Sequence, residues 1–255
     1  MRKWSTPFLA QPLDAAVSRH ALIILNQPFS VALFDRLWNS CNWRCCADGG
    51  ANRLYDLFDS PEIEDGSTVR SLFLPNLIKG DLDSLRDDVK AYYESQGVTI
   101  IHDADQYSTD LMKCVSALEQ KEASEGSKQY IIIFLGGLAG RLDQTIHTLS
   151  YLHKLRKLRE TIFVVTDDNI GWVLDEGEHH ISIDHNVSGP TCGLLPVGVD
   201  STILSTTGLR WNLTEQESSF DGLISTSNHL VPGEDSVWIK TSRPIWWTAE
   251  LRKLD

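Results

Sequence analysis

The stretch Leu77-Ile78-Lys79-Gly80-Asp81-Leu82-Asp83-Ser84 carries the two signals from which the fold follows. Its first two residues form a short apolar run, which is typical of a strand buried in a parallel sheet. The polar turn that follows ends the strand, and acids at strand ends of an open α/β sheet point into the crevice where ligands bind. The stretch therefore predicts an α/β sheet with a ligand site at the carboxyl ends of its strands.

The same pattern of a short apolar run followed by a turn or helix recurs through the first two thirds of the chain. Apolar residues occur at helical spacing after Asp110 and after Asp143, so both acids are expected to open helices. Residues 1–168 are therefore predicted to form an α/β domain with a doubly wound, mostly parallel sheet. The predicted strands are Ala21–Leu25, Arg44–Ala47, Leu77–Ile78, Val98–Ile101, Ile131–Leu135 and Ile162–Val165.

The second part of the chain has a different character. Helical periodicity disappears after about Asn169, and short β-type runs separated by Gly, Pro, Asn and Asp take over. Residues 169–255 are therefore predicted to form an all-β sandwich domain. The predicted strands are Ile181–Ile183, Ser201–Leu204, Leu223–Thr226, Val237–Ile239 and Ile245–Leu251.

Composition and charge narrow the class of protein. Hydrophobic residues make up 42% of the 255 residues, which is typical of a folded globular protein. A net charge of −12 argues against a nucleic-acid backbone as the main partner. No apolar run reaches the roughly 18 residues that would predict a membrane-spanning helix. The five cysteines include no C-x-x-C pair, so we expect reduced thiols and a cytoplasmic location.

Acidic side chains lie at the ends of the predicted strands. Carboxylates that converge repel one another, so a cation is expected among them. Oxygen-only ligands suit Mg²⁺, which also bridges to substrate phosphates. The pair Asp81 and Asp83 is spaced to share one metal ion, and the alternative is a solvated turn. Asp110 could bind metal, cap its helix or do both. The acids that lie after a strand or open a helix are Asp48, Asp81, Asp83, Asp110 and Asp143.

Glycines beside these acids predict close contact with a phosphate-bearing ligand. They allow backbone amides to approach a ligand, here at Gly49, Gly80 and Gly137. Arg141 follows the last of these and can hold phosphate oxygens with its guanidinium fork. A tight strand-to-helix turn needs the same glycines and is the alternative. The spacing matches neither a P-loop nor the dinucleotide fingerprint G-x-G-x-x-G.

Aromatic and small polar residues in the second part are candidates for recognising a flat ring. Trp211 offers an indole for stacking, and Ser225-Thr226-Ser227-Asn228 offers hydroxyls and an amide. Trp246 and Trp247 are further candidates, since a cationic ring gains from an aromatic face. The alternative for each tryptophan is packing in the core or in an interface.

Six motifs that occur in order resemble those of thiamine pyrophosphokinases, which make thiamine diphosphate from thiamine and ATP. The resemblance extends from about Leu22 to Leu251, and it implies an α/β domain, a β-sandwich and a homodimer with active sites between subunits. One departure from the family is Asp175–Thr191, which is expected to be a long loop. The motifs are ADGGAN at Ala47–Asn52, GDLDS at Gly80–Ser84, DQYSTD at Asp105–Asp110, GGLAGRLDQ at Gly136–Gln144, TTGLRWNL at Thr206–Leu213 and STSN at Ser225–Asn228.

The resemblance also implies roles for the residues of these motifs. The Mg²⁺ ligands would be Asp81, Asp83 and Asp110. The residues around ATP and its phosphates would be Asp48, Gln106, Thr109, Arg141 and Asp143, with the backbone of Gly49, Gly80 and Gly137 close by. The residues that face thiamine, contributed by the partner subunit, would be Trp211, Ser225, Thr226, Ser227 and Asn228.

In the implied reaction, the hydroxyl of thiamine attacks the β-phosphorus of MgATP and AMP leaves. Alignment and charge neutralisation would do most of the work. One carboxylate could accept the hydroxyl proton, and the sequence does not identify it. Two alternatives use the same acids: a metal-dependent phosphohydrolase that activates water, and a non-catalytic sensor of nucleotide or thiamine. The residues implied to be catalytic are Asp81, Asp83, Asp110 and Arg141.

Overall fold

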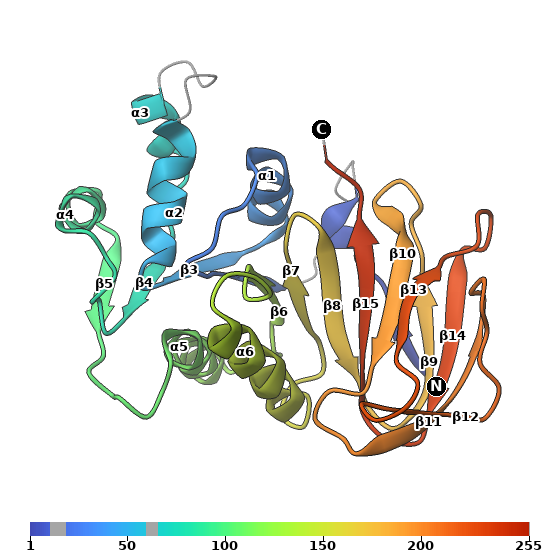
Figure 1. Ribbon diagram of the computed structural model, residues 1–255. Coiled ribbons are helices and arrows are strands. Elements are labelled where there is room, and N and C mark those ends of the chain that lie inside the picture. The colour runs from blue at the N-terminus through green and yellow to red at the C-terminus, as the bar shows by residue number, and fades with distance from the viewer. Residues whose placement is uncertain (11–18, 60–65, 255) are drawn as a thin grey trace. The chain divides into compact units, whose positions relative to one another are not determined.

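A computed structural model of the chain describes residues 1–10, 19–59 and 66–254 (Figure 1). The chain divides into two compact units. The first, here called the α/β unit, comprises Val17–Gly140, and the second, the sandwich unit, comprises Met1–Ala16 together with Arg141–Asp255. Within the described ranges, no helix is long and apolar enough to cross a membrane.

A parallel sheet forms the core of the α/β unit, as predicted. Its strands are β2 (His20–Ile24), β3 (Trp43–Ala47), β4 (Leu77–Gly80), β5 (Thr99–His102) and β6 (Ile131–Leu135). They are ordered β6-β2-β3-β4-β5, and each lies within two residues of its predicted range. Most side chains of β2, β3 and β6 are buried on both faces, which explains the continuous apolar runs.

Helices connect these strands and cover both faces of the sheet. They are α1 (Val31–Ser40), α2 (Gly50–Asp56), α3 (Gly66–Arg70), α4 (Asp87–Ser95) and α5 (Asp110–Glu125), with a 3-10 turn η2 at Leu57–Asp59. The Ser30 side chain caps α1 by accepting a hydrogen bond from the Leu33 N–H at 3.2 Å. α5 ends at Gly126, which takes the left-handed conformation. Because α2 and α5 lie on opposite faces (Figure 1), the sheet is doubly wound.

The strand order creates a topological switch point between β2 and β6. The chain runs from β2 outward through β3, β4 and β5, whereas β6 returns to the other side of β2. In open α/β sheets, ligands bind beyond the carboxyl ends of the strands at such a point. The segments that follow these strands are therefore where a site is expected.

Two sheets make up the described part of the sandwich unit. Its strands are β1 (Arg2–Trp4), β7 (Ile162–Val165), β8 (Asn169–Leu174), β9 (Gly177–Ser182), β10 (Ser188–Leu195), β11 (Ser201–Thr207), β12 (Gln216–Ser219), β13 (Ser225–His229), β14 (Ser236–Thr241) and β15 (Ile245–Leu251). One sheet has the order β1-β9-β14-β11-β12, and the other follows β13-β10-β15-β8-β7. The unit also contains the 3-10 turn η1 (Pro7–Leu9) and α6 (Leu142–Leu155).

Several strands of the sandwich were not predicted, namely β1, β8, β10 and β12. The prediction of a long loop at Asp175–Thr191 is wrong, because this segment contains β9 and the start of β10. Buried His179 and Ile181 alternate there with polar residues, and histidine in an inward position hides the period of two. β1 lacks any apolar run, and it forms because Arg2 to Trp4 pair in parallel with β9.

Tryptophan side chains fill the core of the sandwich unit. Trp4 packs against Trp172 with ring centroids 5.6 Å apart, and its Nε1 donates a hydrogen bond to His179 Nδ1 at 3.0 Å. Burial lowers the pKa of His179. Trp246 and Trp247 are 2% and 0% exposed. They are core residues, so the alternative of packing in the core holds for both, and neither is exposed for stacking on a ligand.

Candidate functional site

Three carboxylates meet beyond the carboxyl end of the parallel sheet. Asp48 follows β3, Asp81 follows β4, and Asp110 is the first residue of α5. One oxygen from each carboxylate lies within 4.8 Å of the other two. Oxygen ligands at such separations suit a hard divalent cation such as Mg²⁺. We call these three residues the acid group, and it is the candidate metal site.

The position of Asp48 depends on an uncommon backbone conformation. Its φ is 43°, in a region that non-glycine residues seldom adopt. The carboxylate is buried and accepts hydrogen bonds from the N–H groups of Ser84 and Leu85, both at 3.1 Å. Burial raises the pKa of Asp48, the bonds from Ser84 oppose this, and the charge of Asp110 adds to it. Asp48 thus anchors the loop after β4 while it contributes to the acid group.

Gly80 is required where these carboxylates approach one another. A Cβ at this position would lie 2.7 Å from the Cβ of Asp48 and 2.9 Å from Oδ1 of Asp110. Such distances are too short for real contacts, so any side chain here would push the two acids apart. Two residues later, Leu82 has a φ of 61°, which turns the loop sharply.

The two acids of the loop after β4 have different surroundings. The Asp81 N–H donates to Asp110 Oδ1 at 3.1 Å, which ties Asp81 to the start of α5. Asp83 donates its N–H to Asp81 Oδ1 at 3.3 Å and accepts from the Ser84 hydroxyl at 3.0 Å. Among the described residues, the acid group includes Asp81 but not Asp83. Its third member is Asp48, for which the family resemblance implied a place beside the nucleotide.

Two buried lysines lie beside acids of this region, and sequence reasoning missed them. The side chain of Lys113 is 2% exposed, and its Nζ lies 3.2 Å from Asp110 Oδ1 and 3.9 Å from Asp81 Oδ2. Lys79 pairs instead with Asp103, at 3.2 Å. The spacing of Lys113 three residues after Asp110, on a predicted helix, was the signal that could have identified it.

Asp105 arranges the segment that precedes α5. Its carboxylate accepts from the Ser108 hydroxyl at 2.6 Å and from the Tyr107 N–H at 2.9 Å, and these bonds lower the pKa of Asp105. Gln106 is exposed. Thr109 stands at the N-cap of α5, and its buried Oγ1 has no hydrogen-bond partner among the described residues. Buried hydroxyls without a partner are uncommon in proteins, and this one is next to Asp110 in the chain.

The glycine loop after β6 is held by Gln27, a third residue that sequence reasoning missed. Gly136 and Gly137 have φ values of 94° and 97°, which glycine adopts without strain. Gln27, just beyond β2, accepts the Gly137 N–H at 2.8 Å and donates its Nε2 to the Ala139 carbonyl. The loop is therefore fixed at the switch point between β2 and β6. An amide side chain directly after a predicted strand was the signal that could have revealed Gln27.

Arg141 and Asp143 lie at the start of α6 in the sandwich unit. Arg141 donates from Nε and Nη2 to the two Asp143 oxygens, at 3.1 and 2.6 Å. This side-chain hydrogen bonding raises the pKa of Arg141 and lowers the pKa of Asp143. Both side chains are more than 60% exposed, at 74% and 64%. An exposed pair is weakly held, so the guanidinium fork can exchange Asp143 for another anion.

Trp211 presents an indole that is 51% exposed on the sandwich unit. The guanidinium of Arg210 lies 4.7 Å from the centre of this ring, and the ring of His229 lies edge-on at 5.2 Å. Asn228 is buried and makes two hydrogen bonds to the Trp211 backbone. Its Oδ1 accepts from the Trp211 N–H at 3.2 Å, and its Nδ2 donates to the Trp211 carbonyl at 2.8 Å. Both polar atoms of Asn228 are thus engaged with the residue that carries the exposed indole.

The other residues of the same motif differ in exposure. Ser225 is buried, whereas Thr226 and Ser227 are exposed. Ser227 has a φ of 53°, another left-handed conformation in a non-glycine residue. Thr226 and Ser227 are therefore the hydroxyl groups of the motif that a ligand can reach in this chain.

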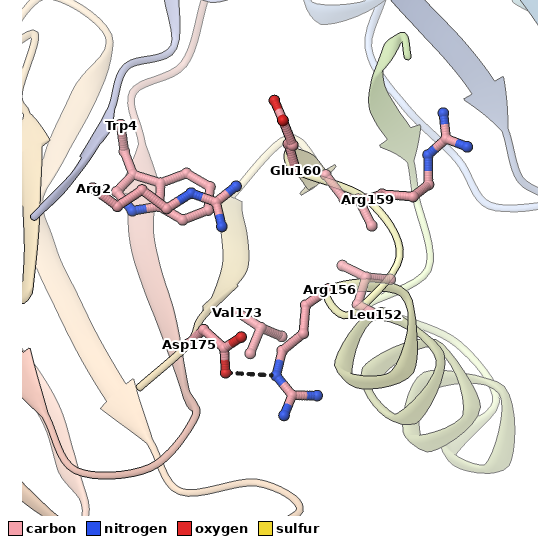
Figure 2. A pocket seen from close by; sticks show the side chains of 9 residues that line it. Arg2, Trp4, Leu152, Arg156, Arg159, Glu160, Val173 and Asp175 are labelled. Atoms are coloured by element: carbon pink, nitrogen blue, oxygen red, sulfur yellow. Dashed lines mark hydrogen bonds and ion pairs between the residues drawn. The ribbon is translucent and has the colours of Figure 1, made fainter. Parts of the chain in front are cut away.

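A small cavity elsewhere in the sandwich unit has a structural role (Figure 2). Its volume is about 10 Å³, which is room for about one water molecule and far too little for a nucleotide. Around it, Arg2 lies 4.3 Å from the centre of the Trp4 ring, and Arg156 Nε pairs with Asp175 Oδ1 at 3.2 Å (Figure 2). The first contact lies within β1, and the second joins the end of α6 to the residue that follows β8.

Comparisons with known proteins cover both parts of the chain. Residues 34–164 match the model of the thiamin pyrophosphokinase catalytic domain, and residues 178–246 match that of the thiamin pyrophosphokinase vitamin B1 binding domain. The chain is 40% identical over 247 residues to thiamine pyrophosphokinase 1 of Oryza sativa subsp. japonica, covering 94% of this chain and 90% of that protein.

Solved structures give the same result. The crystal structure of yeast thiamin pyrophosphokinase matches with a TM-score of 0.84 and 30% identity, covering 98% of this chain and 91% of that chain. Thiamin pyrophosphokinase from Candida albicans matches with a TM-score of 0.81 and 28% identity, covering 92% and 90%. The order of an α/β segment followed by a β-rich segment is therefore shared with these proteins.

Proposed function

This chain belongs to the thiamine pyrophosphokinase family, and we infer that it is an enzyme that transfers the diphosphoryl group of ATP to thiamine and releases AMP. The acid group carries this inference. Its carboxylates lie at the carboxyl ends of a parallel sheet, within the segment that matches the catalytic domain of the family. The match of residues 178–246 to the vitamin B1 binding domain supports thiamine as the acceptor.

The same proposal assigns different ligands to the two parts of the chain. Residues 1–168 bind the nucleotide and the metal, and residues 169–255 bind thiamine and form dimer contacts. The two family matches leave residues 165–177 between them, and the proposed boundary falls in that interval.

Mg²⁺ is the metal proposed for the acid group. The donor set fits this ion, because it consists of carboxylate oxygens within 4.8 Å of one another. Asp81 and Asp110 would hold the ion together with Asp48, and the family resemblance adds Asp83. When bound, Mg²⁺ offsets the negative charge of the phosphates.

The protein's own groups would bind and orient the triphosphate. Because glycine has no side chain, the backbone at Gly49, Gly80 and Gly137 would come close to the phosphates, and Thr109 would supply a hydroxyl that lacks a partner among the described residues. Arg141 would exchange its exposed carboxylate partner for a phosphate. Diphosphoryl transfer needs the thiamine hydroxyl in line with the β-phosphorus, and such alignment supplies much of the rate acceleration. Further hydrogen bonds to the nucleotide are proposed for Gln106 and Asp143.

Thiamine is proposed to stack on Trp211 and to contact the exposed hydroxyls of Thr226 and Ser227, with Ser225 lining the site. In the homodimer that the family resemblance implies, the partner subunit contributes these residues. A cytoplasmic location is also proposed. It is supported by the five cysteines, all of which are free and buried, as is typical of proteins in a reducing compartment.

The activity is tested by incubating the protein with thiamine, ATP and Mg²⁺ and separating the products by chromatography. We expect AMP and thiamine diphosphate in equal amounts, and neither product when EDTA replaces Mg²⁺. Release of phosphate or diphosphate without thiamine would indicate the phosphohydrolase alternative. Binding of both substrates without formation of AMP would indicate the sensor alternative.

Asn228 is proposed to support thiamine binding indirectly, because its two hydrogen bonds fix the backbone of Trp211. Asn228→Ala leaves the Trp211 N–H and carbonyl without their partners, and each lost hydrogen bond is worth about 1 kcal/mol. We expect the KM for thiamine to rise roughly threefold to tenfold, while the KM for ATP stays unchanged, as measured by steady-state kinetics. An equal rise in both KM values would indicate general damage to the fold instead.

A further inference from the structure

Lys113 carries a buried positive charge to which the proposed function assigns no role. Its side chain is 2% exposed and projects from the first turns of α5. A buried ammonium group is costly unless it is paired. Its partners are two members of the acid group, Asp110 at 3.2 Å and Asp81 at 3.9 Å. In the part of the chain that the structure describes, both ion pairs that reach the acid group come from Lys113.

The contact with Asp110 belongs to a wider arrangement. Oδ1 of Asp110 accepts from the Lys113 ammonium and also from the Asp81 N–H at 3.1 Å. Asp48, the third member, accepts hydrogen bonds from the N–H groups of Ser84 and Leu85, and no lysine among the described residues pairs with it. Lys113 is therefore the cation that joins the loop after β4 to the start of α5. Without a cation, the carboxylates of these two segments would repel one another.

The charge of the whole cluster follows from this arrangement. Three carboxylates and one ammonium give −3 + 1 = −2, which equals in magnitude the charge of one divalent ion. The ammonium is buried and held by its two ion pairs, so its positive charge stays beside the site and repels a divalent ion that binds there.

We propose that Lys113 is a positioning residue that keeps the metal ligands assembled when the ion is absent and limits how tightly the cluster binds a divalent ion before the nucleotide arrives. The proposal rests on the metal site of the proposed function. ATP brings its own negative charge, so full affinity for the ion is reached only when the nucleotide is bound. The fixed positive charge of Lys113 thereby couples metal binding to nucleotide binding.

The test measures Mn²⁺ binding by electron paramagnetic resonance, together with thermal unfolding in EDTA and in excess Mn²⁺, all without nucleotide. Lys113→Met removes the charge, and Lys113→Gln removes it while it keeps a hydrogen-bond donor. We expect both variants to bind Mn²⁺ about tenfold more tightly than the wild type, because a unit charge near a divalent ion is worth at least this factor even in water. We expect Tm in EDTA to fall by roughly 5–10 °C, and Mn²⁺ to restore most of this loss.

Two variants serve as controls. Lys113→Arg keeps the charge and should bind Mn²⁺ like the wild type. Lys79→Met removes the other buried lysine, whose partner Asp103 lies outside the acid group, and its Tm should fall equally with and without Mn²⁺.

Several results would overturn the proposal. Unchanged or weaker Mn²⁺ affinity in Lys113→Gln would contradict it, and so would a loss of Tm that Mn²⁺ does not reduce. If Asp81→Asn bound Mn²⁺ with the same affinity as the wild type, the metal site itself would be overturned, and the role of Lys113 with it. Failure of the lysine proposal is therefore distinguishable from failure of the proposed function.

Discussion

Asp81→Asn is expected to lower kcat by about two to three orders of magnitude, the usual cost of losing one charge-stabilising contact. The amide keeps the size of the side chain and one oxygen, but it removes the negative charge that faces the other carboxylates. The fold is expected to remain, because one of three repelling charges is gone. Product formation and Tm in EDTA are the two measurements, and we expect a large change in the first without a loss in the second.

Two further variants show whether the loss of turnover is specific to the acids of the metal site. Asp87→Asn removes an exposed acid at the start of α4 and should leave turnover unchanged. Asp83→Asn tests whether the ion contacts Asp83 as well, as the family resemblance implies. A loss as large as that of Asp81→Asn would place Asp83 on the ion, and a small loss would leave Asp48, Asp81 and Asp110 as the ligands. Normal turnover in Asp81→Asn would refute the metal assignment.

Trp211→Ala is the second change with a large expected effect. Loss of an aromatic stacking surface costs about 1–3 kcal/mol per stacked base, so the KM for thiamine should rise roughly fivefold to 150-fold. The KM for ATP is expected to change little, because the nucleotide residues are proposed to lie in the other part of the chain. Steady-state kinetics with each substrate varied in turn separates the two effects.

The matched variants for this test differ in how much aromatic surface they remove. Trp211→Phe keeps a flat ring and should recover most of the affinity for thiamine. Phe220→Ala removes another exposed aromatic, 64% exposed, and should leave both KM values unchanged. Equal increases in the KM of thiamine and ATP for Trp211→Ala would contradict the stacking role.

The α/β unit could be predicted closely because four of its five described strands, β2, β3, β4 and β6, are mostly buried on both faces. Burial of this kind forces continuous apolar runs, and β6 and β2 are found at or within one residue of the runs that predicted them. Periodicity located α6 but did not show how deeply each turn is buried. Leu152 and Leu155 are buried, whereas Ile146, one of the apolar residues at helical spacing after Asp143, is 53% exposed.

The sandwich unit was harder to predict because its strands depend on partners far away in the sequence. β9 contains two adjacent histidines, and all four residues of β12 are polar. Their propensity for strand is weak, and tertiary pairing with β14 and β11 decides their conformation.

At the site, the convergence of acids could be predicted, but not which of them converge. Parallel strands bring their carboxyl ends to one edge, and this placed Asp48, Asp81 and Asp110 in the same region. The choice of Asp48 over Asp83 depends on the left-handed turns at Asp48 and Leu82. Sequence patterns do not encode such torsions at non-glycine residues. Lys113 was missed because its burial depends on the packing of α5.

The pairing of β1 with β9 has a consequence for biosynthesis. The indole of Trp4 finds its histidine partner 175 residues further along the chain. On the ribosome, the first strand therefore emerges long before its neighbour exists, while the intervening segment Val17–Gly140 already contains every strand of its own parallel sheet. Contacts of such long range form slowly, because a large loop must close first. The α/β unit can thus mature during translation, whereas the sandwich unit must wait for nearly the full chain.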